Sequence, residues 1–221
     1  MACVPGSLDR LREWAPQFPG SIGAHLQLTD GRPRSDPAKV PSLVDRTGAF
    51  PGRRSIPSRF NPREVALEWR AQIDALRGVG LALTHIDSHH HVHWHSELFD
   101  IYVEIAREYR LSARTFQGTA SERLRLAGIR SADYCAAGFY SDKPSMESLL
   151  RVIVEAKWQT PEGGLIELVS HPGHVCDELK LCSVYVRQRE RELEVLTDPG
   201  LIPNLAELAV ELVEAEGNAV E

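Results

Sequence analysis

Short segments of strand character alternate with longer segments of helical periodicity along this chain. Strands are expected at residues 21–28, 81–87, 111–115 and 164–170. In the first of them apolar side chains alternate with polar ones, which is typical of a strand with one buried face. Strands separated by helices form parallel sheets with crossover helices, either closed into a barrel or doubly wound. The alternation therefore predicts an α/β fold.

The most clearly marked helix begins after Asn61. Asn61 is a preferred N-cap residue, Pro62 suits the first turn, and Glu64 completes the pattern of a capping box. An apolar stripe follows at the spacing of one helix face and consists of Val65, Trp69, Ile73 and Leu76. Further helices are expected at residues 98–109, 144–158, 184–196 and 205–214. Residues 29–59, rich in Pro, Gly, Arg and Ser, are predicted to form a long connection of the kind that often carries function.

Size and charge narrow the possible classes of protein. The chain has 221 residues, 43% of them hydrophobic and 25% charged, which suits one globular domain spanning residues 1–221. Its net charge of −6 argues against a nucleic-acid surface, which needs clustered Lys and Arg. No apolar run reaches the roughly 20 residues of a membrane helix, and the first residues lack the regions of a signal peptide. We therefore expect a cytoplasmic protein that binds neither membranes nor nucleic acids.

The histidines are clustered. All nine lie in three short segments: six fall within residues 85–95, and the others are His25, His171 and His174. Each segment lies at or just beyond the end of an expected strand, and the carboxyl ends of parallel strands build the active site in such folds. Imidazole is suited both to metal ligation and to proton transfer near neutral pH. The three segments are therefore predicted to converge on one site.

Parity within the histidine-rich run suggests how its side chains point. Asp87, His89 and His91, like two further histidines, have odd residue numbers. In an extended strand alternate side chains point to the same side, so all of these would project to one side and His90 to the other. A carboxylate would then lie among several imidazoles. Asp87 is expected either to ligate a metal or to orient an imidazole ligand.

A purely structural interpretation competes at each of these positions. A single histidine such as His25 is more often a hydrogen-bonded core or surface residue than a ligand. A solvated loop is the alternative for the histidine-rich run, although the flanking Ile86 and Val92 favour burial. Spacing alone leaves the role of His171 open. Arg114, at the end of an expected strand, is either a substrate contact or a surface arginine.

Three motifs carry a family resemblance: GAHLQLTDGRP at residues 23–33, THIDSHHHVH at 84–93 and ELVSHPG at 167–173. On these motifs the chain resembles the YdjC-like carbohydrate deacetylases, which include chitooligosaccharide deacetylases. The resemblance covers nearly the whole chain. It implies a distorted β/α barrel, similar to a TIM barrel, and hydrolysis of an N-acetyl group from an amino sugar.

The resemblance also implies a set of site residues. The family holds a divalent metal ion with one Asp and two His, and the matching histidines here are His25 and His89. His171 matches the general acid, while Asp87, His91 and Arg114 are expected to support the ligands or contact the substrate. Mg²⁺ is the metal that the resemblance implies first, with Zn²⁺, Mn²⁺ and Co²⁺ as alternatives. The expected partners are the N-acetylated sugar and a second copy in a homodimer.

One family motif does not occur in this sequence. The family begins with a strand carrying Asn-Ala-Asp-Asp-Phe-Gly, whose aspartates supply the third metal ligand and the base, whereas residues 1–6 align with the family's second strand. The single domain is therefore expected to be truncated at its N-terminus, without the first strand and helix of the barrel. That would leave an open sheet edge and a weak, neutral metal site of two histidines.

Three functions remain open at this point. The first is metal-dependent deacetylation of an amino sugar or chitooligosaccharide, with low activity in this chain. The second is a non-catalytic remnant that binds metal or sugar, which the missing aspartates favour. The third is another metal-dependent amide hydrolase, because the sequence does not determine what fills the pocket.

Overall fold

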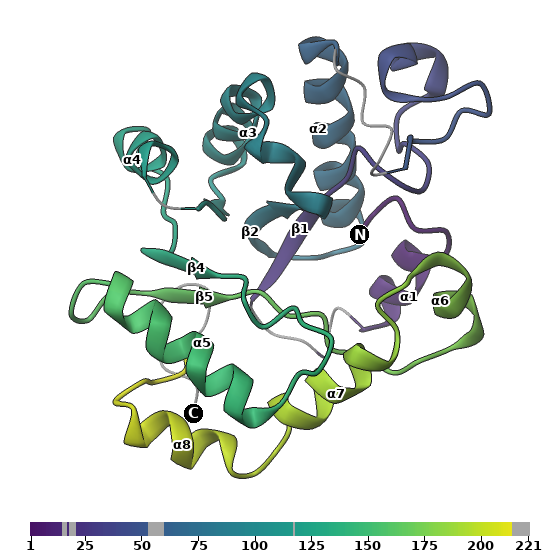
Figure 1. Cartoon of the computed structure of the whole chain (residues 1–221). Coiled ribbons are helices and arrows are strands. Elements are labelled where there is room, and N and C mark those ends of the chain that lie inside the picture. The colour runs from purple at the N-terminus through teal and green to yellow at the C-terminus, as the bar shows by residue number, and fades with distance from the viewer. Residues whose placement is uncertain (15–16, 18–20, 53–59, 117, 214–221) are drawn as a thin grey trace. The chain divides into compact units, whose positions relative to one another are not determined.

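The structure is a computed structural model and describes residues 1–213 except 15–16, 18–20, 53–59 and 117 (Figure 1). Its contacts divide the chain into two compact units. The described residues of the first unit are Met1–Arg114 and Glu122–Ser131, and those of the second are Thr115–Ser121 and Ala132–Val213. We call them the N-terminal and C-terminal units and describe each by itself.

The N-terminal unit is built on a parallel sheet of three strands. Its order is β1 (Ile22–Leu26), β2 (Leu83–Ser88) and β3 (Ser112–Ala113). The helices α2 (Pro62–Gly78) and α3 (Ser96–Tyr109) pack against each other beside this sheet (Figure 1). The remaining elements are α1 (Ser7–Trp14), the 3-10 helices η2 (Pro37–Lys39), η3 (Pro41–Leu43) and η5 (His89–Trp94), and α4 (Thr119–Leu126), whose first turn is assigned to the other unit.

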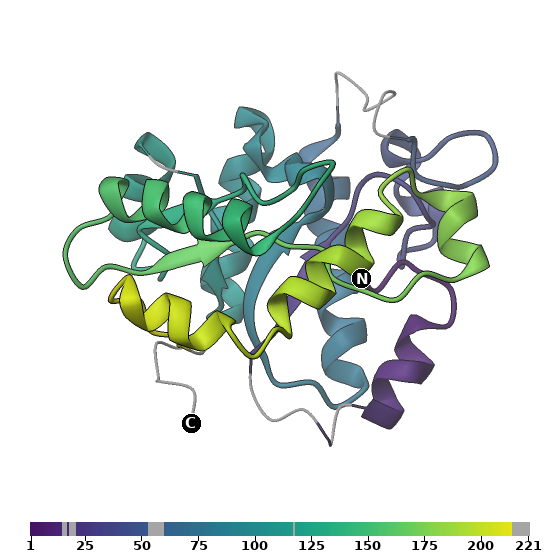
Figure 2. The ribbon, with the colours of Figure 1, turned by 60° about the horizontal axis from the view of Figure 1, so that its bottom comes forward.

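The C-terminal unit contains a second parallel pair, β4 (Tyr134–Ala136) and β5 (Ile166–Leu168). Helix α5 (Met146–Gln159) contacts both strands, and α8 (Leu201–Glu207) contacts α5 (Figure 2). The chain between β5 and α8 forms α6 (Asp177–Cys182) and α7 (Arg187–Leu196). A buried cluster joins α5, α8 and the loop after β4, and it consists of Phe139, Leu149, Ile153, Leu201 and Leu205.

Helix α2 shows which local signals determined the fold. The Asn61 side chain accepts the N–H of Arg63, as expected of the N-cap, and the predicted stripe of Val65, Trp69, Ile73 and Leu76 is buried. The predicted capping box differs in detail. Glu64 accepts hydrogen bonds from the Asn61 side-chain amide and from the N–H of Ser42. The glutamate thus ties the helix start to η3.

The last predicted helix is largely wrong. Only residues 205–207 of the expected segment 205–214 are helical, because α8 begins earlier, at Leu201, and ends at Glu207. Ala209 has a left-handed backbone with φ of 50°, which stops the helix. The apolar periodicity beyond this residue is therefore not helical. Residue 214 lies outside the described residues.

The prediction of an α/β fold with parallel strands is confirmed, since every strand pairing that the structure describes is parallel. Closure into a distorted barrel and the single domain over residues 1–221 stay predictions. None of the helices that the structure describes combines the length and the apolar character needed to cross a membrane.

Candidate metal centre and candidate acid

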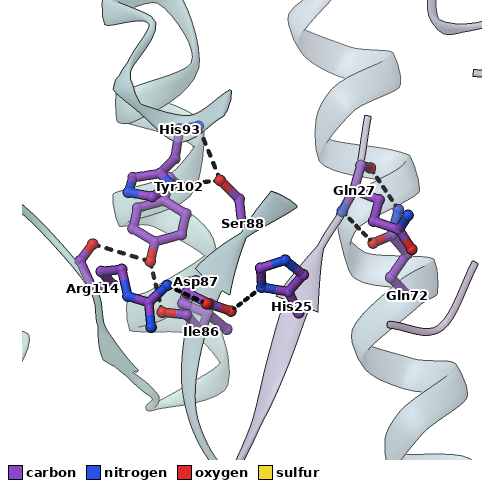
Figure 3. A network of polar contacts seen from close by, with 9 residues as sticks. All are labelled: His25, Gln27, Gln72, Ile86, Asp87, Ser88, His93, Tyr102 and Arg114. Atoms are coloured by element: carbon purple, nitrogen blue, oxygen red, sulfur yellow. Dashed lines mark hydrogen bonds and ion pairs between the residues drawn. The ribbon is translucent and has the colours of Figure 1, made fainter. Parts of the chain in front are cut away.

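The register of β1 and β2 brings His25 beside Asp87. These residues are direct partners in the parallel pair, and His25 Nδ1 lies 2.7 Å from Asp87 Oδ1 (Figure 3). The other carboxylate oxygen lies 2.6 Å from Nη1 of Arg114, which follows β3. A chain of contacts therefore runs from Arg114, just after β3, through Asp87 in β2 to His25 in β1.

The close approach of β1 and β2 also explains Gly23, the partner of His85 in the register. A Cβ atom at Gly23 would lie only 2.2 Å from Nε2 of His85. A larger residue would have to displace the His85 ring, which lies over Gly23. Glycine at this position therefore leaves room for that ring.

Asp87 is a carboxylate that stays ionised although it is buried. Burial opposes its charge and acts to raise the pKa, but the hydrogen bond with His25 and the charge of Arg114 outweigh it and lower the pKa well below the usual range. An ionised Asp87 accepts the Nδ1–H of His25. That tautomer leaves the Nε2 lone pair of His25 available for a ligand, as in carboxylate–histidine–metal arrangements.

The histidine-rich run does not continue as an extended strand, so the predicted projection by parity is wrong beyond Ser88. Strand β2 ends at Ser88, and His89–Trp94 forms a 3-10 helix in which His90 and His91 have left-handed backbones, each with φ of 53°. Such conformations typically cost about 1–3 kcal/mol each for residues other than glycine and are characteristic of functional sites. The turn directs His90 toward the residues that follow β1.

The turn gathers two imidazoles around Asp30, a carboxylate that follows β1. Nε2 of His89 lies 3.6 Å and Nδ1 of His90 3.9 Å from Asp30 Oδ2. Among the described residues, Asp30, His89 and His90 form the group whose potential ligand atoms all lie within 4.8 Å of one another. A carboxylate therefore lies beside the histidine-rich run, which the expectation of a site with two histidines alone did not include.

Two histidines compete to complete this group. The His25 ring lies 5.5 Å from the His89 ring, centroid to centroid, and its Nδ1 is held by Asp87. In His90, Nδ1 faces Asp30 but also lies 2.9 Å from Thr29 Oγ1. Each ring thus has its Nδ1 engaged and its Nε2 as a second possible ligand atom. The ligand-atom distances place His90 in the group with Asp30 and His89, whereas the family resemblance implies His25.

The loop that carries Asp30 is anchored by helix α2. The Gln72 side chain makes two 2.8 Å hydrogen bonds with the backbone N–H and C=O of Gln27 (Figure 3). Glu68, fully buried one turn earlier, accepts hydrogen bonds from the N–H groups of Arg34 and Ser35 at 2.9 and 2.8 Å. Both ends of the segment around Asp30 are thus fixed to one rigid element.

His93 is a buried member of the run. Its ring stacks on Tyr102 with centroids 4.5 Å apart, and Nδ1 lies 2.5 Å from Ser88 Oγ (Figure 3). Burial, together with the charge of neighbouring His91, lowers the pKa of His93 to about 3. It is therefore a neutral imidazole of the core. His91 itself stacks on Trp94, with centroids 4.5 Å apart.

Acid should destabilise the fold through His93. The unfolded imidazole titrates near 6.5, whereas the folded one stays neutral down to about pH 3. Between these values the unfolded state binds the extra proton, so stability falls as the pH falls. His93→Phe keeps a ring on Tyr102 and removes this proton. Its unfolding free energy should depend on pH less steeply, by up to about 1.4 kcal/mol per pH unit.

Urea unfolding in EDTA at several pH values between about 6 and 4 measures this slope. Asp87, whose ordinary pKa is 3.8, adds to the slope only toward the acid end of that window and does so equally in the wild type and in His93→Phe. The exposed His95 provides a matched control, because His95→Ala should keep the wild-type slope. Equal slopes in the wild type and His93→Phe would contradict the assignment.

His171 lies in the C-terminal unit, three residues beyond the last residue of β5. Its backbone N–H donates to the fully buried carboxylate of Glu192, and its C=O accepts from Nη1 of Arg189 at 3.2 Å. Its ring lies 5.3 Å from that of Tyr140, edge to face. Helix α7 thus fixes the backbone of the predicted acid. Sequence reasoning missed Glu192, since a carboxylate in a strongly charged helix resembles a solvated residue.

Fold and site together define a class: an α/β protein that gathers imidazoles and carboxylates after parallel strands. The sequence profile of the family described as YdjC-like protein matches residues 1–207. The chain therefore belongs to the YdjC-like family, as its motifs predicted.

Its relatives include proteins named carbohydrate deacetylase. The one from Geobacillus stearothermophilus is 35% identical over 215 residues, which cover 96% of this chain and 82% of that protein. The one from Thermoanaerobacter pseudethanolicus is 34% identical over 196 residues, covering 87% and 75%. A chitooligosaccharide deacetylase from Yersinia pestis is 32% identical over 206 residues, covering 90% and 79%.

A crystal structure from Enterococcus faecalis is also similar. It is described as that of a cellobiose-phosphate cleavage protein and is 30% identical to this chain. The match covers 100% of this chain and 86% of that one, with a TM-score of 0.85. The mixed α/β architecture is therefore shared with a solved structure.

Proposed function

We propose that the protein is a metal-dependent hydrolase that removes the N-acetyl group from an amino sugar or a chitooligosaccharide. The observation that carries the proposal is the grouping of Asp30, His89 and His90 after β1 and β2, with the His25 ring 5.5 Å from that of His89 and Asp87 bonded to His25. The reaction is supported by relatives named carbohydrate deacetylase and chitooligosaccharide deacetylase. A distorted β/α barrel is the fold in which we expect this reaction to occur.

The residues present fit a divalent cation. One carboxylate oxygen from Asp30 and imidazole nitrogens from His25 and His89 form the mixed set that suits Zn²⁺, Mn²⁺ or Co²⁺. Mg²⁺, the metal expected from the family, prefers oxygen ligands and would keep several waters here. A bound cation would activate water and stabilise the negative charge that develops on the amide oxygen.

The chain's own residues then have separate roles. Asp87 holds His25 in the tautomer that presents Nε2, and Arg114 fixes the other oxygen of Asp87. We assign to His171 the transfer of a proton to the nitrogen of the departing amine, which cannot leave as an anion. Hydrolysis then yields acetate and the free amino sugar.

Acetate release from di-N-acetylchitobiose tests the proposal. We expect release with at least one of Mg²⁺, Mn²⁺, Zn²⁺ and Co²⁺, and its loss when EDTA removes the metal. Release that EDTA does not affect would refute the metal dependence. An absence of release with all four metals would refute the deacetylase, and metal binding without release would favour the non-catalytic alternative.

A further inference from the structure

The C-terminal unit places an exposed aromatic ring next to the proposed acid. Tyr140 follows β4 and His171 follows β5, and these strands are parallel neighbours. The hydrogen bond from Val169 N to Ala136 O extends the pairing toward both loops. Because the carboxyl ends of parallel strands lie at one edge of a sheet, the Tyr140 ring comes within 5.3 Å of the His171 ring.

The Tyr140 ring is supported from behind. It stacks on Tyr185 with centroids 4.1 Å apart and an interplanar angle of 22°. Tyr185 is only 6% exposed, and its hydroxyl donates to the buried Glu192, the carboxylate that also holds the N–H of His171. Burial and this carboxylate raise the pKa of the Tyr185 phenol, so it remains a donor. Tyr140 therefore rests on a fixed base.

The outer face of Tyr140 is not covered by His171. The imidazole lies 5.3 Å from Tyr140 and 6.0 Å from Tyr185, at 71° to both rings. An imidazole over the outer face would be far more distant from Tyr185 than from Tyr140, because the two phenol rings are stacked. His171 thus lies beside the stack. Tyr140 is 50% exposed, whereas the preceding Phe139 is fully buried in the core and anchors the loop.

We infer that Tyr140 is a sugar-binding platform on which a pyranose ring of the substrate stacks next to His171. The inference rests on the proposed function and adds a substrate-binding residue to it. The face of a pyranose that carries axial C–H groups is apolar and slightly positive, and it complements the negative face of an aromatic ring. A rigid aromatic side chain binds at a low entropic cost, and stacking here orients the substrate relative to the acid.

An NMR titration with chitobiose, the fully deacetylated disaccharide, measures binding without turnover. Tyr140→Ala should weaken the affinity by about tenfold, whereas Tyr140→Phe should bind like the wild type. Trp158→Ala is the matched control, because Trp158 is an aromatic residue of the same unit that is 83% exposed. Its affinity should be unchanged, and circular dichroism checks that each variant is folded.

The outcomes separate this inference from the proposed function. Wild-type affinity in Tyr140→Ala, or a wild type that does not bind chitobiose, overturns the platform. An equal loss in Trp158→Ala overturns it as well. If Tyr140→Ala loses chitobiose binding while the wild type releases no acetate with any metal, the sugar-binding platform is supported and the deacetylase proposal is refuted. If the wild type releases acetate and Tyr140→Ala binds chitobiose normally, only the platform is refuted.

Discussion

Replacing His89 with alanine is expected to raise the dissociation constant for Zn²⁺ or Mn²⁺ by about a hundredfold or more, because it removes one of three protein ligands. Asp30→Ala should have a similar effect, since it removes the only charge among them. Calorimetric titration with each metal measures this. His95→Ala is the matched control, because His95 is exposed and lies at the start of α3 outside the cluster. Unchanged affinity in His89→Ala would contradict the metal centre.

The third ligand can be determined by the same titration. If His25 ligates, His25→Ala should weaken metal binding about as much as His89→Ala, whereas His90→Ala should have little effect, because His90 would then only neighbour the ion while its Nδ1 contacts Thr29. Asp87→Asn should weaken binding by roughly 10- to 100-fold by disturbing the orientation of His25. The reverse order, a large loss in His90→Ala and none in His25→Ala, would assign the site to Asp30, His89 and His90.

Replacing His171 with alanine is expected to lower kcat for acetate release by roughly 10²- to 10⁴-fold, which is the usual contribution of a general acid. Metal affinity should be unchanged. His174→Ala is the matched control, because His174 is an exposed histidine only three residues away. It should keep wild-type activity.

The leaving group provides a sharper test of the role of His171. A less basic amine, such as the nitroaniline of an acetanilide, needs little protonation to depart. If His171 is the acid, His171→Ala should be impaired far less on such a substrate than on the sugar. Equal impairment on both substrates would show that His171 acts in some other way, and full activity on the sugar would remove it from the mechanism.

The sequence predicted the parts of the fold that local signals determine. Helix α2 follows from Asn61, Pro62 and an apolar stripe whose four members are all buried. The strands β1 and β2 were predicted from short apolar segments, although their observed ends differ from the predicted ends by up to two residues. The C-terminal helix was misplaced because the left-handed turn at Ala209 leaves the apolar periodicity intact.

The candidate site was harder to predict, because its geometry depends on contacts that are distant in sequence. The motif around His25 and the histidine-rich run were visible, but parity failed where His90 and His91 turn left-handed. Asp30 was not predicted as a metal ligand, because an Asp-Gly pair after a strand is also typical of an ordinary turn. Tyr140 and Glu192 acquire their roles only through the pairing of β4 with β5 and the packing of α7.

A diffraction measurement tests the central claim most directly. Crystals soaked in Mn²⁺ and measured near its absorption edge would show the ion as an anomalous peak. We expect one peak within about 2.0–2.4 Å of Asp30 Oδ2, His89 Nε2 and His25 Nε2, with Asp87 still bonded to His25 Nδ1. A peak that lies away from His25 and His89, or well-ordered side chains with no peak between them, would contradict the account.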